Sequence, residues 1–423
     1  MDRVNKIIHL LENGQHKEAL DEYNVVLNKG SHEEKFMLGE ELFHYGFLEE
    51  ANALIEKLLT VFPEEGELLI LLAEILVEAG EEEQAILVLE KISTQDANYG
   101  QSLLLLADLY QMEGLYEVSE NKILKAKELL PNEIIIDFAL GELYGEQGEI
   151  LKAMKAYEDV LKETNEIAGV NIHSRMADLL SASGAFEDAL IYYDKALEEK
   201  LEINTLFGYA FTALQAGYNR TAIEKFTELK ELDPEYHSLY LHLASAYERE
   251  EELENSLRIV QEGIKQDEFN KELFYKGGKI ALKLGMEEEA EKYLRESLVL
   301  DPGYLEAAIT LNKLFLQQER YKDVIELISE LDLAAEDEPQ LLWDSALAYE
   351  GLEEFSDALD KYESAYTYFK NNETFLTDYG YFLIEEGKTD LAAEIFKQIL
   401  LKDPTNTEVL DLLERLTESG DLN

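Results

Sequence analysis

Cysteine is absent from this 423-residue sequence, and its absence excludes several kinds of chemistry at once. Without thiols the chain forms no disulfides, holds no metal through thiolates and offers no cysteine nucleophile. A composition of this kind is typical of proteins in a reducing compartment. We therefore expect a cytoplasmic protein.

Basic residues are scarce as well. Lysine and arginine together number 37 against 91 aspartates and glutamates, which gives a formal net charge of −54 at pH 7. A surface this negative repels phosphate backbones and anionic lipid headgroups. The composition argues against nucleic acid as a partner.

Long apolar runs are also missing. No stretch approaches the roughly 20 apolar residues that a membrane-spanning helix needs. The first fourteen residues, MDRVNKIIHLLENG, have apolar side chains at amphipathic spacing with polar ones between them, unlike the unbroken apolar core of a signal peptide. We expect no membrane insertion.

Catalytic and cofactor motifs are likewise lacking. The seven histidines form no HExxH pair, and neither a nucleophile elbow nor a phosphate-binding glycine loop occurs. With so many carboxylates, a chance pair of acids carries no information about acid–base chemistry. The sequence predicts a protein without enzymatic activity, cofactor or metal.

What the sequence does contain is one short pattern that returns along the whole chain. A small residue, called the anchor below, is followed four positions later by a large residue, usually apolar. Successive anchors lie 32 to 36 positions apart, and mostly 34. A fixed period of this length is typical of helical repeat proteins. The anchors are Ala19, Ala51, Ala85, Ser119, Ala153, Ala189, Ala222, Ser256, Ala290, Val324, Ala358 and Ala392.

Other positions of the repeat predict where two helices begin and end. Glycine lies five residues before the anchor, where it would end the first helix in the left-handed conformation, except at Glu251, Glu319 and Glu353. Five of the six prolines lie twelve residues after an anchor, where they would end the second helix. A small residue twelve before the anchor would let paired helices approach closely, although Ile7 and Asn312 depart from this rule.

These features resemble the tetratricopeptide repeat family, a helix-turn-helix of 34 residues. The resemblance implies an all-α, right-handed solenoid of about twelve repeats over residues 1–406, followed by a C-terminal capping helix and tail at 407–423. The longest interval between anchors predicts a lengthened loop or a bend near 163–170. The large aromatic residue four positions after the anchor is present at Tyr23, Tyr157, Tyr193, Phe226, Tyr362 and Phe396.

In this family the first helix of each repeat lines a concave groove, so side chains eleven positions before the anchor are candidates for partner contacts. We call this set the groove row. From the second to the sixth repeat it reads Glu40, Glu74, Asp108, Glu142 and Asp178, and these acids would attract a basic segment. An equally open alternative is that they form a solvated surface.

The ninth and tenth repeats carry a lysine cluster instead. In FYKGGKIALKLG, Lys276, Lys279 and Lys283 share one helix face beside Tyr275, and Lys313 follows one repeat later. These residues would receive an acidic segment or a chain end, or else only neutralise an acidic surface. The extra glycine, Gly277, has no explanation in the repeat pattern. Aromatic groove anchors or junction residues are expected fifteen before the anchor, at Phe36, Phe138, Phe207, Tyr275 and Trp343.

The function that the sequence predicts is a non-enzymatic scaffold or adaptor that binds segments of other proteins. A regulatory adaptor that delivers clients to a larger machine, such as a protease, a chaperone or a cell-envelope complex, is the alternative. A self-assembling structural protein is a third possibility. Periodicity encodes the fold and leaves the partner and the oligomeric state open.

Overall fold

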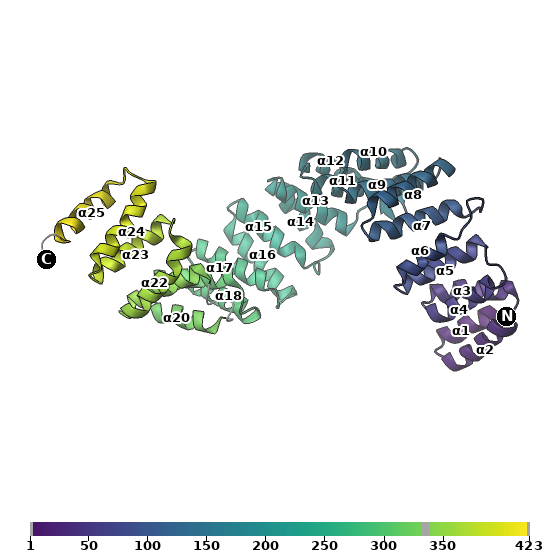
Figure 1. Ribbon diagram of the computed structural model, residues 1–423, viewed down its shortest axis with the longest axis horizontal. Coiled ribbons are helices and arrows are strands. Elements are labelled where there is room, and N and C mark those ends of the chain that lie inside the picture. The colour runs from purple at the N-terminus through teal and green to yellow at the C-terminus, as the bar shows by residue number, and fades with distance from the viewer. Residues whose placement is uncertain (1–2, 332–337, 421–423) are drawn as a thin grey trace. The chain divides into compact units, whose positions relative to one another are not determined.

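The computed structural model describes residues 3–331 and 338–420. The chain divides into two compact units, Met1–Leu201 and Glu202–Asn423. Among the described residues each unit contains six pairs of antiparallel helices; the first unit also has a short β-hairpin and the second has one further helix (Figure 1). The predicted helical hairpin repeat is confirmed.

In the first unit, the first helices of the six repeats are α1 (Arg3–Glu12), α3 (His32–His44), α5 (Gly66–Glu78), α7 (Tyr99–Met112), α9 (Ile134–Glu146) and α11 (Ile172–Ala182). The second helices are α2 (His16–Lys29), α4 (Leu48–Leu59), α6 (Glu82–Leu89), α8 (Tyr116–Leu129), α10 (Ile150–Leu161) and α12 (Phe186–Glu199).

In the second unit, the first helices are α13 (Ile203–Gln215), α15 (Ser238–Arg249), α17 (Lys271–Lys283), α19 (Leu305–Gln317), α21 (Pro339–Gly351) and α23 (Glu373–Glu385). The second helices are α14 (Asn219–Leu232), α16 (Leu253–Gln266), α18 (Glu287–Leu300), α20 (Tyr321–Glu330), α22 (Phe355–Phe369) and α24 (Thr389–Lys402), and the end helix is α25 (Thr407–Gly420).

The turn inside each repeat has the predicted left-handed residue. After α1, Gly14 has φ of 71°, its N–H donates to Leu11, and the N–H of Gln15 donates to Leu10. These two bonds form a Schellman motif, which satisfies carbonyls at the helix end. Glu353 adopts the same conformation with φ of 61° although it carries a side chain. Here the backbone geometry of the repeat overrides the preference of the residue.

The small residue of the first helix makes room for the large residue of the second. A Cβ added to Gly141 would lie 2.5 Å from the ring of Tyr157, and one added to Gly380 would lie 2.5 Å from the ring of Phe396. Both glycines precede the ring residue by sixteen positions. The pattern read from the sequence is therefore a direct packing contact.

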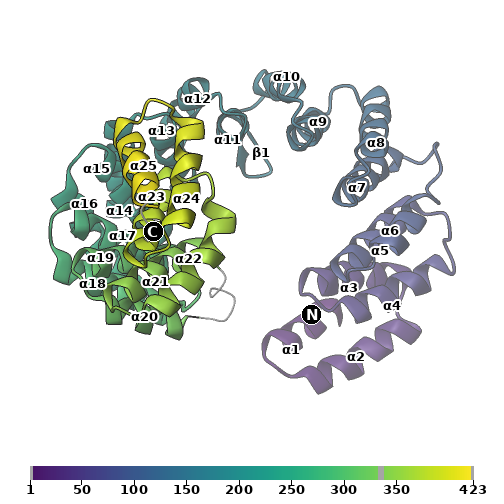
Figure 2. The ribbon, with the colours of Figure 1, turned by 60° about the vertical axis from the view of Figure 1, so that its left-hand side comes forward.

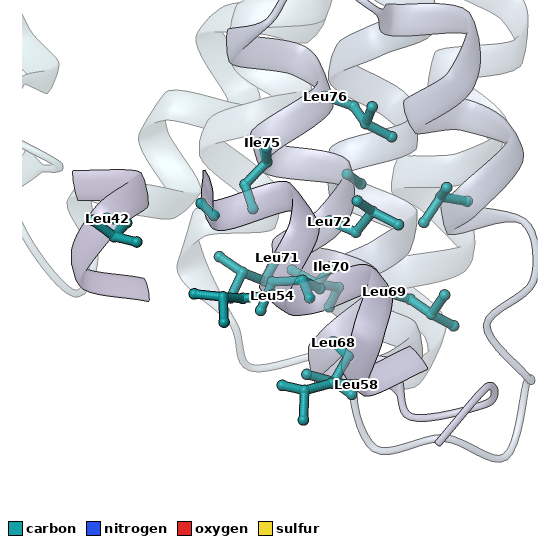
Figure 3. Packing of buried hydrophobic residues seen from close by; sticks show 14 of the residues in the cluster. Leu42, Leu54, Leu58, Leu68, Leu69, Ile70, Leu71, Leu72, Ile75 and Leu76 are labelled. Carbon is teal, nitrogen blue, oxygen red and sulfur yellow. The ribbon is translucent and has the colours of Figure 1, made fainter. Parts of the chain in front are cut away.

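The core of each unit runs through its helix pairs. All twelve anchors are at most 2% exposed, which confirms the predicted register of the repeats. In the first unit, α5 is buried on nearly all sides, and Figure 3 shows its leucines beside Leu42, Leu54 and Leu58 of α3 and α4. Burying a side chain of this size stabilises the fold by about 1.5–3 kcal/mol.

The lengthened interval near 163–170 forms a β-hairpin within the first unit. Strand β1 (Glu166–Ile167) pairs antiparallel with β2 (Val170–Asn171), just before α11 (Figure 2). Ala168 and Gly169 both have positive φ, as a two-residue hairpin turn requires. The bend proposed for this segment stays a prediction.

One repeat has a polar core instead of a small residue. Asn312 of α19 is fully buried, and its Nδ2 lies 3.5 Å from Oδ2 of Asp344 in α21. Oδ1 of Asn312 has no partner among the described residues. Nε2 of Gln340 donates to Oδ1 of Asp344 over 2.9 Å. Burial raises the pKa of Asp344 to about 6.

The end helix covers the last repeat much as predicted. Val409 and Leu413 are buried, and Leu416 packs against the core of α21 to α24. Leu410 is 40% exposed, whereas Leu412 packs against the same core. The reason is geometric, because Leu410 is a single position after Val409 and so points about 100° away from it. The tail at 421–423 lies outside the described residues.

Candidate interaction surface

The acids of the groove row in the first unit fall into two classes. Glu142 accepts from the side chain of Arg175 and, over 2.6 Å, from the hydroxyl of Tyr157. The hydroxyl of Tyr193 donates to Asp178 over 2.7 Å. These two carboxylates are satisfied within the chain.

Glu40, Glu74 and Asp108 form the second class, called the free acids below. Among the residues that the structure describes, none of the three has an ion pair or a hydrogen bond through its side chain. Burial raises the pKa of Glu40, and the neighbouring carboxylate of Glu67 adds to the effect. Burial also raises the pKa of Glu74. A cation that replaced water beside Glu40 or Glu74 would stabilise the ionised form of the carboxylate.

An apolar notch separates two of the free acids. Its walls are Ala73 and Val77 of α5, Leu89 of α6, and Leu105 and Leu109 of α7, and its volume is about 120 Å³. The side chains of Glu74 and Asp108 also line it. The notch therefore combines hydrocarbon walls with two carboxylates that have no ion pair or side-chain hydrogen bond among the described residues, although the nearby His44 partly offsets the effect of burial on the pKa of Glu74.

The lysine cluster of the second unit also falls into two classes, lysines that are ion-paired within the chain and lysines that are not. Lys276 and Lys283 both donate to Glu248 of α15, the latter over 2.7 Å. The burial of Glu248 would raise the pKa of its carboxyl, but the hydrogen bonds from the two lysines lower it below its usual value. Two of the four predicted lysines thus form an internal ion-pair network between adjacent repeats.

Lys279 and Lys313 remain exposed, and no described carboxylate lies within ion-pair distance of either. The amino group of Lys279 lies 5.3 Å from the ring centre of Tyr275. Tyr275 in turn contacts Tyr304 at 5.2 Å between ring centres. The positive charge available in this part of the groove row therefore comes from two lysines on adjacent first helices.

The aromatic row is partly buried at repeat junctions. Phe207 lies between Tyr236 and His242, at 5.0 and 5.8 Å between ring centres. Trp343 packs against Phe375 at 5.4 Å. Burial lowers the pKa of His242 below its usual value. These rings stabilise the junctions and leave only part of their surface for a partner.

The structure also explains Gly277, the extra glycine of the lysine helix. A Cβ at this position would lie 3.2 Å from Tyr293 of α18 and 3.2 Å from Val260 of α16. The residue is wedged between two neighbouring helices. A larger residue would push both neighbours back by a few tenths of an ångström, so the close packing favours glycine here.

Sequence reasoning missed Arg175 and Glu248, which decide which charges are internally paired. A usable signal was present, since Arg175 follows Glu142 by 33 positions, and Lys276 and Lys283 follow Glu248 by 28 and 35. Two first-helix residues that are about one repeat apart in the sequence lie on neighbouring first helices. Opposite charges at this spacing are candidates for pairing.

Comparison with known proteins gives the family. The sequence is 43% identical to the TPR repeat-containing protein YpiA of Bacillus subtilis (strain 168) over 415 residues, which cover 98% of each chain. The chain belongs to the YpiA-like tetratricopeptide repeat proteins. Family models for YpiA-like repeats match residues 111–165 and 339–406, and general tetratricopeptide repeat models match 42–117 and 272–304.

Solved tetratricopeptide repeat structures resemble parts of this YpiA-like chain. A repeat protein from Parabacteroides merdae is 20% identical, with a TM-score of 0.42 over 59% of this chain and 98% of its own. YrrB, described as a TPR protein with an unusual peptide-binding site, is 17% identical, with a TM-score of 0.38 over 44% of this chain and 95% of its own. MamA is 20% identical, with a TM-score of 0.34 over 44% and 95%.

The YpiA-like family is built from repeats that serve as protein-interaction modules and are generally non-catalytic. Within the described segments 3–331 and 338–420, no helix is both long and apolar enough to cross a membrane. Among the side chains described, no three histidines or acids are grouped in a way that could hold a metal ion.

Proposed function

We propose that this YpiA-like protein is a non-enzymatic cytoplasmic scaffold that binds extended segments or helices of partner proteins along the first helices of its repeats. The observation that carries the proposal is the set of groove-row charges that form no ion pair with any described residue. Glu40, Glu74 and Asp108 supply negative charge in the first unit, while Lys279 and Lys313 supply positive charge in the second.

The two sets favour different partner segments. A basic segment complements the free acids, and an acidic segment or a chain end complements the two lysines. The large negative charge of the whole chain raises the encounter rate with basic segments. Aromatic and apolar contacts in the groove then set how long a complex lasts.

Site-specific photo-crosslinking in cells tests this proposal. A photoreactive residue would replace Met37 on α3, at the repeat position equivalent to Leu105, or Tyr381 on α23, in the groove row; both are exposed. The control replaces Leu151, which is 87% exposed on the second helix α10. We expect discrete protein adducts from the first-helix positions and none from Leu151.

Adducts at Leu151 alone, or no adducts anywhere, would contradict the scaffold proposal. Mass spectrometry of the adducts also separates the two forms of the proposal. A stable complex of several subunits favours an adaptor that delivers clients to a larger machine, whereas single transient partners favour a general scaffold.

A further inference from the structure

The notch between α5 and α7 has a shape and a charge that select one kind of side chain. Its floor is hydrocarbon from Ala73, Val77 and Leu105, and its two polar lining residues are Glu74 and Asp108. We propose that it receives the side chain of a lysine or arginine from a partner segment, with the aliphatic stem on the floor and the cationic end between the two carboxylates.

Volume is the first argument for this occupant. The notch measures about 120 Å³. An apolar cavity of about 150 Å³ accommodates benzene, so the stem of a basic side chain fits here. Long cationic side chains commonly lie along apolar surface while their charged end reaches polar groups.

Charge is the second argument. Neither carboxylate has an ion pair or a side-chain hydrogen bond with the described part of the chain. A purely apolar side chain in the notch would strip water from these acids without replacing it, and an acidic one would add repulsion. A cation replaces the lost hydration with charge-assisted hydrogen bonds.

The contrast with the next acids of the row is the third argument. Glu142 already holds Arg175, which reaches it from the following first helix. The chain thus places its own guanidinium against one carboxylate of the row and leaves Glu74 and Asp108 open. The notch offers a partner the same kind of contact that Arg175 makes internally.

Peptide binding to the full-length protein tests the inference, which rests on the proposed scaffold function. The probes are nine-residue peptides, capped at both ends, whose central residue is lysine, ornithine, diaminobutyrate or norleucine. The first three keep the charge and shorten the stem by one methylene at a time. We expect calorimetry to give about a fourfold loss of affinity per methylene removed. Norleucine, which lacks the charge, should bind at least tenfold more weakly than lysine.

Variants that remove the same number of charges distinguish binding in the notch from long-range attraction by the chain's negative charge. Glu74→Gln combined with Asp108→Asn should weaken the lysine peptide at least tenfold. The control pair, Glu117→Gln with Glu128→Gln, removes the same charge from exposed positions of α8 and should change affinity less than twofold. Circular dichroism should show unchanged helicity in both.

Equal losses in the two variants, or equal affinity for lysine and diaminobutyrate, would overturn the assignment. Methyl NMR gives an independent readout, because the lysine peptide should shift Val77 and Leu105 signals before others. If photo-crosslinked adducts form at the first-helix positions while the lysine peptide shifts neither Val77 nor Leu105 signals of the unaltered protein, the scaffold function stands and the notch assignment is refuted.

Discussion

Asp344 is the buried carboxyl whose replacement should change stability most clearly. It is 2% exposed, and burial raises its pKa from 3.8 to about 6. In the unfolded chain the pKa returns to its ordinary value, so the folded state binds the proton more tightly. This group therefore lowers the free energy of unfolding as pH rises from about 4 through 6, with no further change above that range.

Asp344→Asn removes the charge while keeping the shape. A pKa difference of about two pH units corresponds to about 3 kcal/mol, since each unit is worth about 1.4 kcal/mol. We expect the variant to be stabilised by about 3 kcal/mol at pH 8 and by about half of that at pH 5. Nδ2 of Asn312 now faces Asp344, so a half-turn of the Asn312 amide would bring its unpartnered Oδ1 to the new amide as an acceptor.

The protein carries its own probe for this measurement. Trp343 is the chain's one tryptophan, next to Asp344, and it packs against Phe369 and Phe375. Its fluorescence during urea unfolding reports on this repeat. The control Asp360→Asn neutralises an exposed carboxylate on α22 and should have an effect within about 0.5 kcal/mol. A stabilisation by Asp344→Asn that does not grow between pH 5 and pH 8, or a destabilisation, would refute the reasoning.

Three further predictions concern backbone strain, packing and charge. Glu353→Gly should raise the free energy of unfolding by about 0.5–1 kcal/mol in the Trp fluorescence assay, because φ at this position is 61° and glycine relieves the strain. Gly277→Ala should lower the melting temperature, because the added Cβ would lie 3.2 Å from two neighbours. The control Gly145→Ala should raise the melting temperature, because its Cβ has its nearest neighbour at 3.5 Å and alanine favours the helix more than glycine does. Lys276→Glu would face Glu248 and should destabilise the protein by about 2 kcal/mol, and this effect should shrink when Glu248→Gln is added.

The register of the repeats could be read from the sequence because it rests on local, periodic information. The anchors, the left-handed turn and the small residue opposite the large one each depend on residues within about one repeat. Their recurrence twelve times makes the pattern hard to mistake. Glu353 shows how strong the period is, because this residue, an exception to the glycine rule, still adopts the left-handed turn in the structure.

The groove row could be located from the sequence, but its free charges could not. Helical spacing places Glu142 in the row and Lys276 one turn before Lys279 on the same helix face. Whether they are free depends on Glu248 and Arg175, which come from neighbouring helices. The outcome depends on how those helices cross and which way long side chains turn, and spacing along the chain fixes neither.

Periodicity and composition were therefore enough to predict the helix pairs, the positions of their turns, the buried anchors and the excess of negative charge. Tertiary structure decided the rest, namely the notch beside Glu74, the pairing of Lys276, and the buried contact between Asn312 and Asp344. The physical reason is that a repeat fixes each helix through nearby residues, whereas cavities and ion pairs form between repeats, where small differences in packing decide which atoms meet.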